Sequence, residues 1–487
     1  MTNLDISRKR NYFSHCILTH DKVGDRIGKG FEVEQIQRYN FSETRRDRMG
    51  WYEESVVYQI YPLGFCGAPR KNNGKLVHRI RKIVDYIPYL KELGVDVLLL
   101  NPVFESDRHG YDTRDYSRLD VRLGEREDLA YVSEELHKNG IRLMLDGVFN
   151  HVGRGFFGFQ DVLKHREASK FKDWFHIRFY DNNVYEDGLS YDGWEGHYDL
   201  VKLNLNNEQV VNYLLDAVTS WIKEFQVDGL RIDVAYCLNK TFLRRMKEHT
   251  RQLKSDFVLV GEVLFGDYNI FVNDEMLQSC TNYECYKGIY SSLNDLNLFE
   301  INYSLNRQFN HRQNGIYQGK HLLTFVDNHD VSRIASIVKN SNHLPLAYTL
   351  LFTIPGVPCI YYGSEWGEKA DKKEGDYKLR PKISKPNKND TFAFHKQLIE
   401  IYHKEPALQY GGYETISITN QQLVFKRQYQ EETVVVALNA DSMPIVLPLN
   451  EMKGTFLSLL TGEEVEIDRE IRLEGYDVVI LKLPLAK

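Results

Sequence analysis

The feature that most constrains this chain is a regular alternation of two patterns that begins at Trp51. Short β-branched apolar runs, which read as strands, occur at 56–61, 96–100, 141–148, 227–233, 257–263, 322–328 and 357–362, with a weaker eighth near 280–283. Stretches with helical spacing of apolar residues lie between most of them, at about 77–93, 126–139, 207–225, 239–254 and 343–353. Strand–helix alternation is typical of an α/β fold with a parallel sheet. Seven or eight such units in roughly 350 residues favour a closed (β/α)8 TIM barrel over an open sheet.

Two intervals depart from this alternation and predict further parts of the chain. Residues 151–206, after the third strand, are rich in Gly, Asp, His and aromatic residues. Because about 55 residues is too long for an ordinary loop, we expect a small inserted subdomain within a catalytic barrel that spans 51–410. Alternating strand patterns over 411–487 predict a C-terminal antiparallel β-sandwich domain. Residues 1–50 are charged and weakly patterned, which predicts an N-terminal extension.

Charge and hydropathy exclude two classes of partner. The chain has 62 Lys and Arg against 68 Asp and Glu, a net charge of −6, and no long basic run, so we expect no nucleic-acid partner. No apolar stretch has the length of a membrane span, and the N-terminus lacks an apolar signal core. We therefore expect no membrane partner and a cytoplasmic protein. The six cysteines lack metal-type spacing and are expected to be reduced thiols.

Polar residues gather at the carboxyl ends of the predicted strands, which meet at one rim of a barrel of this kind. The third, fourth, fifth and seventh strands end in Asp146-Gly-Val-Phe-Asn150-His151, Gly229-Leu-Arg231-Ile-Asp233, Gly261-Glu262-Val263 and Asp327-Asn328-His329-Asp330. Any one of these groups could be a barrel salt bridge, a strand-end cap or a core histidine. Three carboxylates, two histidines and an arginine together are hard to explain by packing, because desolvated carboxylates are costly.

The fourth strand shows how the chemistry could be arranged. Side chains alternate along a strand, so Arg231 and Asp233 share one face. We expect Arg231 to lower the pKa of Asp233 and keep it ionised, as a nucleophile requires. Such a set suits glycoside hydrolysis, in which one carboxylate attacks the anomeric carbon. A second carboxyl, with a pKa raised by the neighbouring charge, protonates the leaving oxygen.

The four strand-end motifs, in this order, resemble those of the α-amylase family (glycoside hydrolase family 13), particularly its intracellular maltodextrin-degrading members. The resemblance implies that Asp233 is the nucleophile, Glu262 the acid/base, and Asp330 a residue that stabilises the transition state. It also implies a substrate-binding set, which we complete with Tyr61 from the first strand: Tyr61, Tyr111, Asp146, His151, Arg231, His329, Asp376 and Arg380.

The chain also departs from the family pattern. Asn150 stands where many members ligate calcium, but Tyr236-Cys237 replaces a Lys-His pair that serves an acceptor subsite and that ion. A thiol is a poor ligand for a hard cation. We predict no required cofactor, with Asn150 as the candidate calcium ligand. Leu264 stands where related members commonly carry Trp.

Three functions remain open at this point. The first is a retaining hydrolase that cleaves α-1,4-glucosidic bonds of maltodextrins or starch-like glucans through a covalent glycosyl-enzyme. The second is a 4-α-glucanotransferase or other transglycosylase, which would use the same catalytic residues. The third is a non-catalytic carbohydrate-binding relative, against which the three retained carboxylates argue.

Overall fold

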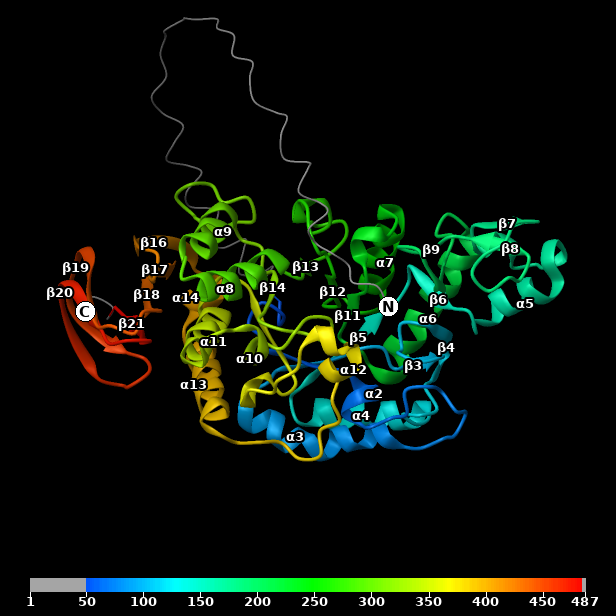
Figure 1. Cartoon of the computed structure of the whole chain (residues 1–487), viewed down its shortest axis with the longest axis horizontal. Coiled ribbons are helices and arrows are strands. Elements are labelled where there is room, and N and C mark those ends of the chain that lie inside the picture. The colour runs from blue at the N-terminus through cyan, green and yellow to red at the C-terminus, as the bar shows by residue number, and fades with distance from the viewer. Residues whose placement is uncertain (1–49, 484–487) are drawn as a thin grey trace, which may run out of the picture. The chain divides into compact units, whose positions relative to one another are not determined.

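The computed structural model describes residues 50–483, and within them the predicted (β/α)8 barrel is confirmed (Figure 1). Eight parallel strands are paired in the order β13-β12-β11-β5-β2-β1-β15-β14. A parallel bridge between Thr281 and Leu323 joins the two edge strands and closes the sheet. The strands are β1 (Val57–Ile60), β2 (Val97–Leu100), β5 (Arg142–Gly147), β11 (Gly229–Ile232), β12 (Val258–Gly261), β13 (Ser279–Cys280), β14 (Leu323–Phe325) and β15 (Val357–Tyr361).

Helices surround this barrel, and their starts follow from the sequence. The side chain of Asn207 accepts a hydrogen bond from Gln209 N at the start of one, and Asn239 does the same for Thr241 N at another. The helices at predicted positions are α3 (Lys82–Leu93), α4 (Arg126–Lys138), α6 (Glu208–Phe225), α7 (Lys240–Leu253) and α11 (Leu344–Thr353). The sequence analysis missed α8 (Tyr283–Asp295), α9 (Phe299–Phe309) and α13 (Asp390–Lys404).

The barrel interior is apolar away from the site. Inward-facing side chains of the strands form one buried cluster, which includes Val57, Leu99, Met144, Val260 and Phe325. The alternate positions of the same strands, such as Leu230 and Leu259, pack in the larger core that includes the helices. This alternation places Arg231 on the inward face and confines the polar residues to one end of the barrel.

Residues 151–206, the predicted inserted subdomain, carry their own small elements. These are a three-stranded sheet of β6 (His151–Gly153), β10 (His197–Lys202) and β9 (Gly193–Trp194), a hairpin of β7 (Ile177–Phe179) and β8 (Leu189–Tyr191), and helix α5 (Phe157–His165). Leu203 N donates to Asn150 O at 3.0 Å, which ties the end of β10 to the chain just after β5. Strand β6 therefore starts at His151, directly beside the catalytic end of the barrel.

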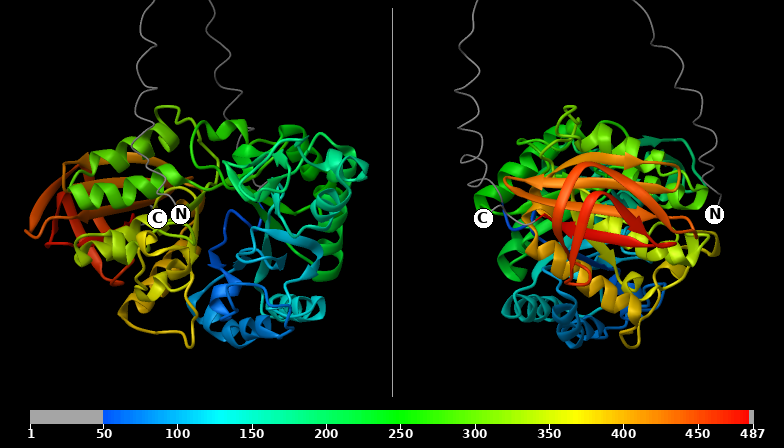
Figure 2. Two further views of the ribbon diagram at one scale, coloured as in Figure 1. Left: turned by 45° about the vertical axis from the view of Figure 1, so that its right-hand side comes forward. Right: turned by 90° about the vertical axis from the view of Figure 1, so that its left-hand side faces the viewer.

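The C-terminal strands form the predicted antiparallel domain. A six-stranded sheet has the order β16-β17-β18-β21-β19-β20; its strands are β16 (Gly412–Ile418), β17 (Gln422–Tyr429), β18 (Glu432–Asn439), β19 (Ile445–Ser458), β20 (Glu464–Leu473) and β21 (Val478–Lys482). The long β19–β20 hairpin arches across the other strands (Figure 2, right). It encloses a separate apolar cluster with Val424, Val435, Phe456 and Ile467, which makes the two layers of a sandwich.

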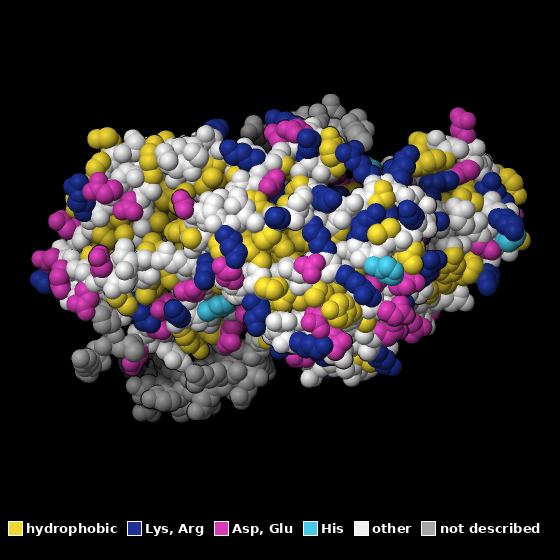
Figure 3. Space-filling view, turned by 90° about the horizontal axis from the view of Figure 1, so that it is seen from below, with side chains coloured by type: hydrophobic (Ala, Val, Ile, Leu, Met, Phe, Trp, Pro, Cys, Tyr) yellow, Lys and Arg dark blue, Asp and Glu magenta, His cyan; other side chains and the backbone are white. Residues whose placement is uncertain are grey.

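Other sequence predictions meet the structure as follows. The five cysteines of the described residues are free thiols, as expected. No helix within residues 50–483 is long and apolar enough to cross a bilayer. On the face shown in Figure 3, basic and acidic side chains are interspersed, without one basic patch. The division at 151–206 and near residue 410 stays a prediction, and the extension predicted at 1–50 falls almost wholly outside the described residues.

Candidate active site

Arg231, from β11, is the hub of the candidate site. Its Nη1 donates to both oxygens of Asp146, each at 2.7 Å, and to Asp233 Oδ1 at 3.2 Å. Its Nη2 lies 2.9 Å from Glu262 Oε1. The side chains of Asp233 and Glu262 are each 7% exposed and that of Asp146 is fully buried. One guanidinium therefore brings together carboxylates from three neighbouring strands, β5, β11 and β12.

The backbone after Asp233 completes this arrangement. Val234 adopts a left-handed conformation with φ of +40°, which is strained for a β-branched residue. In this conformation its N–H donates to Glu262 Oε2 at 3.0 Å. The strained conformation of Val234 thus accompanies a hydrogen bond that links the backbone next to Asp233 with the side chain of Glu262.

The expectation that Arg231 lowers the pKa of Asp233 is wrong for the net effect. Burial and the charge of Glu262 raise the pKa of Asp233 well above its ordinary value, although Arg231 opposes them. The reason is that Arg231 is shared among three carboxylates and cannot compensate the burial of all of them. Burial and the neighbouring carboxylate thus disfavour the charged form of Asp233 in the free enzyme.

A second arginine organises the other half of the site. Arg380 Nη2 donates to Asp330 Oδ1 at 2.8 Å, and His329 Nε2 lies 2.9 Å from Asp330 Oδ2. Burial alone would raise the pKa of Asp330, but His329 and the Arg380 guanidinium outweigh burial and hold that pKa well below its ordinary range. Gly64 makes this placement of Arg380 possible, since an added Cβ would lie 2.2 Å from Arg380 O.

Aromatic rings line this second half. The ring of His329 lies between those of Tyr111 and Tyr61, at centroid distances of 5.6 and 6.5 Å and nearly parallel to both. Arg380 covers the Tyr61 ring at 4.6 Å. Tyr61 donates its hydroxyl hydrogen to His109 O at 2.8 Å, and the Tyr111 hydroxyl donates to Asp146 Oδ2 at 3.0 Å. The hydroxyl groups of the two tyrosines thus fix neighbouring residues of the site, and their rings line it.

His151 supplies an unused donor beside the predicted nucleophile. Its Nδ1 lies 3.1 Å from Asn150 Nδ2, and its Nε2 lies 4.0 Å from Asp233 Oδ2. Burial lowers the pKa of His151 to about 3, so the ring is neutral. An Asn150 amide that donates to Nδ1 leaves the hydrogen on Nε2, which has no hydrogen-bond partner among the described residues. A buried donor without a partner is costly, and a hydroxyl of a bound ligand would satisfy it.

Two predicted substrate-binding residues lie apart from the open site. Asp146 is fully enclosed behind Arg231, with its oxygens also accepting from Asn101 Nδ2 and the Tyr111 hydroxyl. Asp376 is about half exposed on α12 (Asp376–Leu379) and pairs with Lys372 at 2.9 Å. The former suits a positioning role, and the latter is a surface ion pair in this structure.

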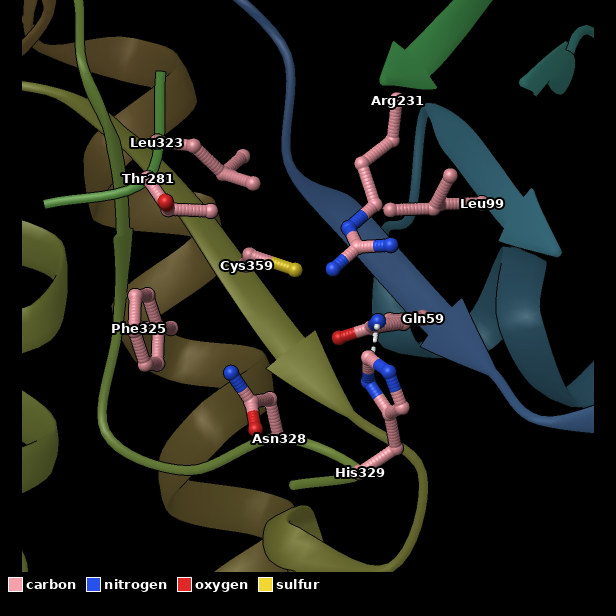
Figure 4. A pocket seen from close by; sticks show the side chains of 9 residues that line it. All are labelled: Gln59, Leu99, Arg231, Thr281, Leu323, Phe325, Asn328, His329 and Cys359. Carbon is pink, nitrogen blue, oxygen red and sulfur yellow. Dashed lines mark hydrogen bonds between the residues drawn. The ribbon is translucent and has the colours of Figure 1, made fainter. Parts of the chain in front are cut away.

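The sequence analysis missed three residues in contact with the site, which are Tyr283, Gln59 and Asn101. Tyr283 donates to Glu262 Oε1 at 3.4 Å and accepts from Asn328 Nδ2 at 3.1 Å. Gln59 Nε2 lies within hydrogen-bonding distance of both Asn101 and His329. Figure 4 shows Gln59 and His329 in a small pocket that Arg231 and Cys359 also line. The alternation along the first strand, which puts Gln59 on the same inward face as Val57, could have revealed the glutamine.

The residues around Asn150 do not fit a calcium ion. The Asn150 side chain is directed to His151 Nδ1. Cys237, which replaces the family's histidine, carries a soft thiol whose pKa is raised by burial. Among residues 50–483, no group of three or more His, Cys, Asp or Glu side chains could hold a metal.

Comparisons with known proteins identify a matching sequence family and related structures. Residues 59–405 match the sequence family described as "Alpha amylase, catalytic domain", and residues 413–480 match "Maltogenic Amylase, C-terminal domain". The chain is 29% identical over 429 residues to a cyclomaltodextrinase of Thermoanaerobacter pseudethanolicus, a match covering 83% of this chain and 73% of that protein. An intracellular maltogenic amylase of Bacillus subtilis is 29% identical over 423 residues, 82% of this chain and 71% of its own. The crystal structure of Ttha1563 from Thermus thermophilus superposes with a TM-score of 0.79 at 28% identity, covering 89% of this chain and 99% of the other.

Proposed function

Since the chain belongs to the α-amylase family of glycoside hydrolases, we propose that it cleaves α-1,4-glucosidic bonds of maltodextrins or starch-like glucans with retention of configuration. The observation that carries this proposal is the shared guanidinium: Asp233 and Glu262 contact different nitrogens of Arg231. A shared guanidinium makes the two carboxyl groups close neighbours, and retaining glycosidases require such a close pair.

In the first step, Asp233 Oδ attacks the anomeric carbon while the bond from that carbon to the leaving oxygen breaks. Glu262 gives its proton to that oxygen, so the shorter sugar leaves with a free hydroxyl. This step requires Asp233 to be ionised and Glu262 to carry the proton when the sugar is bound. The product of this step is a glycosyl ester of Asp233.

In the second step, Glu262 takes a proton from a water molecule whose oxygen attacks the anomeric carbon. The ester bond breaks, Asp233 regains its charge, and Glu262 is again protonated. Asp330, held ionised beside Arg380, is placed to bind sugar hydroxyls and to favour the positive charge that develops on the sugar ring.

We infer the substrate class and the cellular location from the named relatives. Those proteins are a cyclomaltodextrinase and maltogenic amylases, which supports short or cyclic malto-oligosaccharides as substrates. A relative is named as intracellular, and we extend that location, the cytoplasm, to this chain. We propose no required cofactor, because the donor groups near Asn150 do not suit calcium.

A second candidate function is transfer of the glycosyl group to another sugar. One observation favours it: the rings of Tyr236 and Phe265 lie 5.6 Å apart, on the segments that follow Asp233 and Glu262. Phe265 is 61% exposed, and a flat apolar ring of this kind can stack on an acceptor sugar that competes with water.

Two measurements on one sample test these proposals. Proton NMR of maltoheptaose digestion should show the α-anomer of the product first, since two inversions at one carbon restore its configuration. Early appearance of the β-anomer would contradict retention. Product analysis with maltotriose separates hydrolysis from transfer, because oligosaccharides longer than the substrate form early only by transfer.

A further inference from the structure

Beneath the candidate catalytic residues, four buried side chains form a closed ring of hydrogen bonds. Gln59 Nε2 lies 3.1 Å from Asn101 Oδ1, and Asn101 Nδ2 lies 3.1 Å from the Tyr111 hydroxyl. The Tyr111 hydroxyl lies 2.5 Å from His329 Nε2, and His329 Nδ1 lies 3.2 Å from Gln59 Nε2. Figure 4 shows the last of these contacts. The ring joins the predicted sugar-binding histidine to strand β1 and to the residue after β2.

The carboxylate of Asp146 sets the direction of every hydrogen bond in this ring. Both of its oxygens accept from Arg231, so Asp146 can only accept from its other neighbours. Asn101 must therefore turn its Nδ2 to Asp146 Oδ2, 3.0 Å away. Its Oδ1 then faces Gln59 as an acceptor, and Gln59 must present Nε2 in return. The same Nε2 carries the hydrogen that points at His329 Nδ1.

The hydrogen-bond partners of the two His329 nitrogens determine which of them carries the hydrogen. Since Gln59 donates to Nδ1, that nitrogen has no hydrogen of its own. His329 Nε2 faces Asp330 Oδ2 at 2.9 Å and the oxygen of Tyr111, whose own hydrogen goes to Asp146. Two oxygen acceptors around Nε2 require a hydrogen on it. Both nitrogens thus specify one neutral tautomer.

We propose that Gln59 is a positioning residue that bars a proton from His329 Nδ1 and so keeps this histidine neutral, with its hydrogen on Nε2. Several titratable or charged groups face His329 from the elements around it. They are Tyr61, Tyr111, Arg231, Asp330, Cys359, Tyr361 and Arg380. Adding a proton to His329 would place a third cation beside Arg231 and Arg380.

The consequence for catalysis rests on the proposed function. Glycoside cleavage passes through a transition state with positive charge on the sugar ring. A cationic His329 would repel that charge and would compensate the carboxylate of Asp330 that favours it. A neutral ring with Nε2–H can still donate to a sugar hydroxyl. Gln59, which the mechanism does not use directly, therefore maintains the charge balance of this half of the site.

A first test needs no turnover and stands apart from the proposed function. The full chain labelled with ¹⁵N-histidine would be studied by long-range ¹H–¹⁵N correlation, with the signal of His329 identified by its loss in His329→Asn. At pH 5 and pH 6 we expect the pattern of a neutral ring that is protonated on Nε2. Two protonated nitrogens, or a hydrogen on Nδ1, would overturn the proposal.

A second test uses the pH dependence of kcat/KM on an aryl maltoside. In Gln59→Glu an acceptor faces Nδ1 and favours a cationic His329, so the acidic limb should move upward by at least about one pH unit, a tenfold loss on that limb. Gln59→Met has a similar size but places no hydrogen against Nδ1, so its acidic limb should move in the same direction and by less than that of Gln59→Glu.

A purely structural role for Gln59 predicts another result: both variants lose activity and neither limb moves. That outcome would overturn the proposal. The limb shift must also disappear when Gln59→Glu is combined with His329→Asn, compared with His329→Asn alone. A shift that persists in the double variant would have another origin and would equally overturn it.

Discussion

The two halves of the candidate site are built around one arginine each, yet they treat their carboxylates in opposite ways. Arg231 contacts Asp146, Asp233 and Glu262, and the pKa of Asp233 is raised. His329 and Arg380 both contact Asp330, and together they lower its pKa against the effect of burial. Burial and the other neighbours of each carboxylate therefore decide the direction of its pKa shift, and an adjacent arginine alone does not.

This difference suits the two tasks. Two adjacent carboxyl groups can serve as nucleophile and acid once the substrate separates their environments. A carboxylate with its own arginine stays ionised through the reaction and can act electrostatically throughout. The predictions below test this comparison, from the largest expected effect to the smallest.

Asp233→Asn should reduce turnover of maltoheptaose by at least about 10⁴-fold, because the near-isosteric amide cannot form the glycosyl ester. It also removes one of the three carboxylates that share Arg231, so the melting temperature should stay the same or rise. Circular dichroism and a reducing-sugar assay would measure both. A melting temperature well below that of the parent would show that the third carboxylate beside Arg231 stabilises the fold.

Glu365 extends the comparison to a fully buried carboxyl that is held by uncharged donors. It accepts from the hydroxyls of Tyr58 and Tyr89 at 2.5 and 3.0 Å and from Gly363 N at 2.8 Å. Burial raises the pKa of Glu365 to about 7 despite these hydrogen bonds. Its folded pKa therefore exceeds its unfolded one, so its contribution is complete below about pH 4 and declines as pH rises through 7.

Between pH 5 and pH 8.5 we therefore expect Glu365 to account for a decline of about 3 kcal/mol in the free energy of unfolding. Glu365→Gln should flatten that part of the stability curve, since the amide does not ionise. Urea unfolding at several pH values would measure the slope. Equal slopes in the two proteins would mean that Glu365 has the same pKa in the folded and the unfolded state.

Asp330→Asn should lower the free energy of unfolding by about 1–3 kcal/mol at pH 7, because it leaves the buried guanidinium of Arg380 without its carboxylate. The folded pKa of Asp330 is depressed, so this contribution is present above about pH 4 and is lost as pH falls below that value. Asp376→Asn, in an exposed pair with Lys372, is the matched control and should change stability by less than about 0.5 kcal/mol.

Chelation should have the smallest effect. With excess EDTA we expect the melting temperature to change by less than about 2 °C, the shift of well under 1 kcal/mol in a chain of this size. The reason is the poor fit of the donors around Asn150 to calcium. A large loss of stability on chelation, reversed by added calcium, would show that the family's ion is bound after all.

Much of the fold and part of the site could be predicted because they depend on local patterns. Every barrel strand and five of the flanking helices follow from apolar spacing, while α8, α9 and α13 were missed. Helix α8 shows why: Tyr283 on its first turn faces Glu262, so its pattern mixes core and site residues. Gln59 was missed although its alternation with Val57 put it on the inward face, because its contacts with Asn101 and His329 form only when β1 lies beside its neighbours in the barrel.

The sequence by itself determined the (β/α)8 barrel, the antiparallel C-terminal domain and the strand ends at which the carboxylates stand. It could do so because strand and helix periodicity and the common rim of a parallel barrel are properties of the chain read in order. Only the tertiary structure decided that Arg231 is divided among three carboxylates while Arg380 serves Asp330. Charge balance depends on which groups share a neighbour within a few ångströms, and residues from β5, β11 and β12 become neighbours only when the barrel closes.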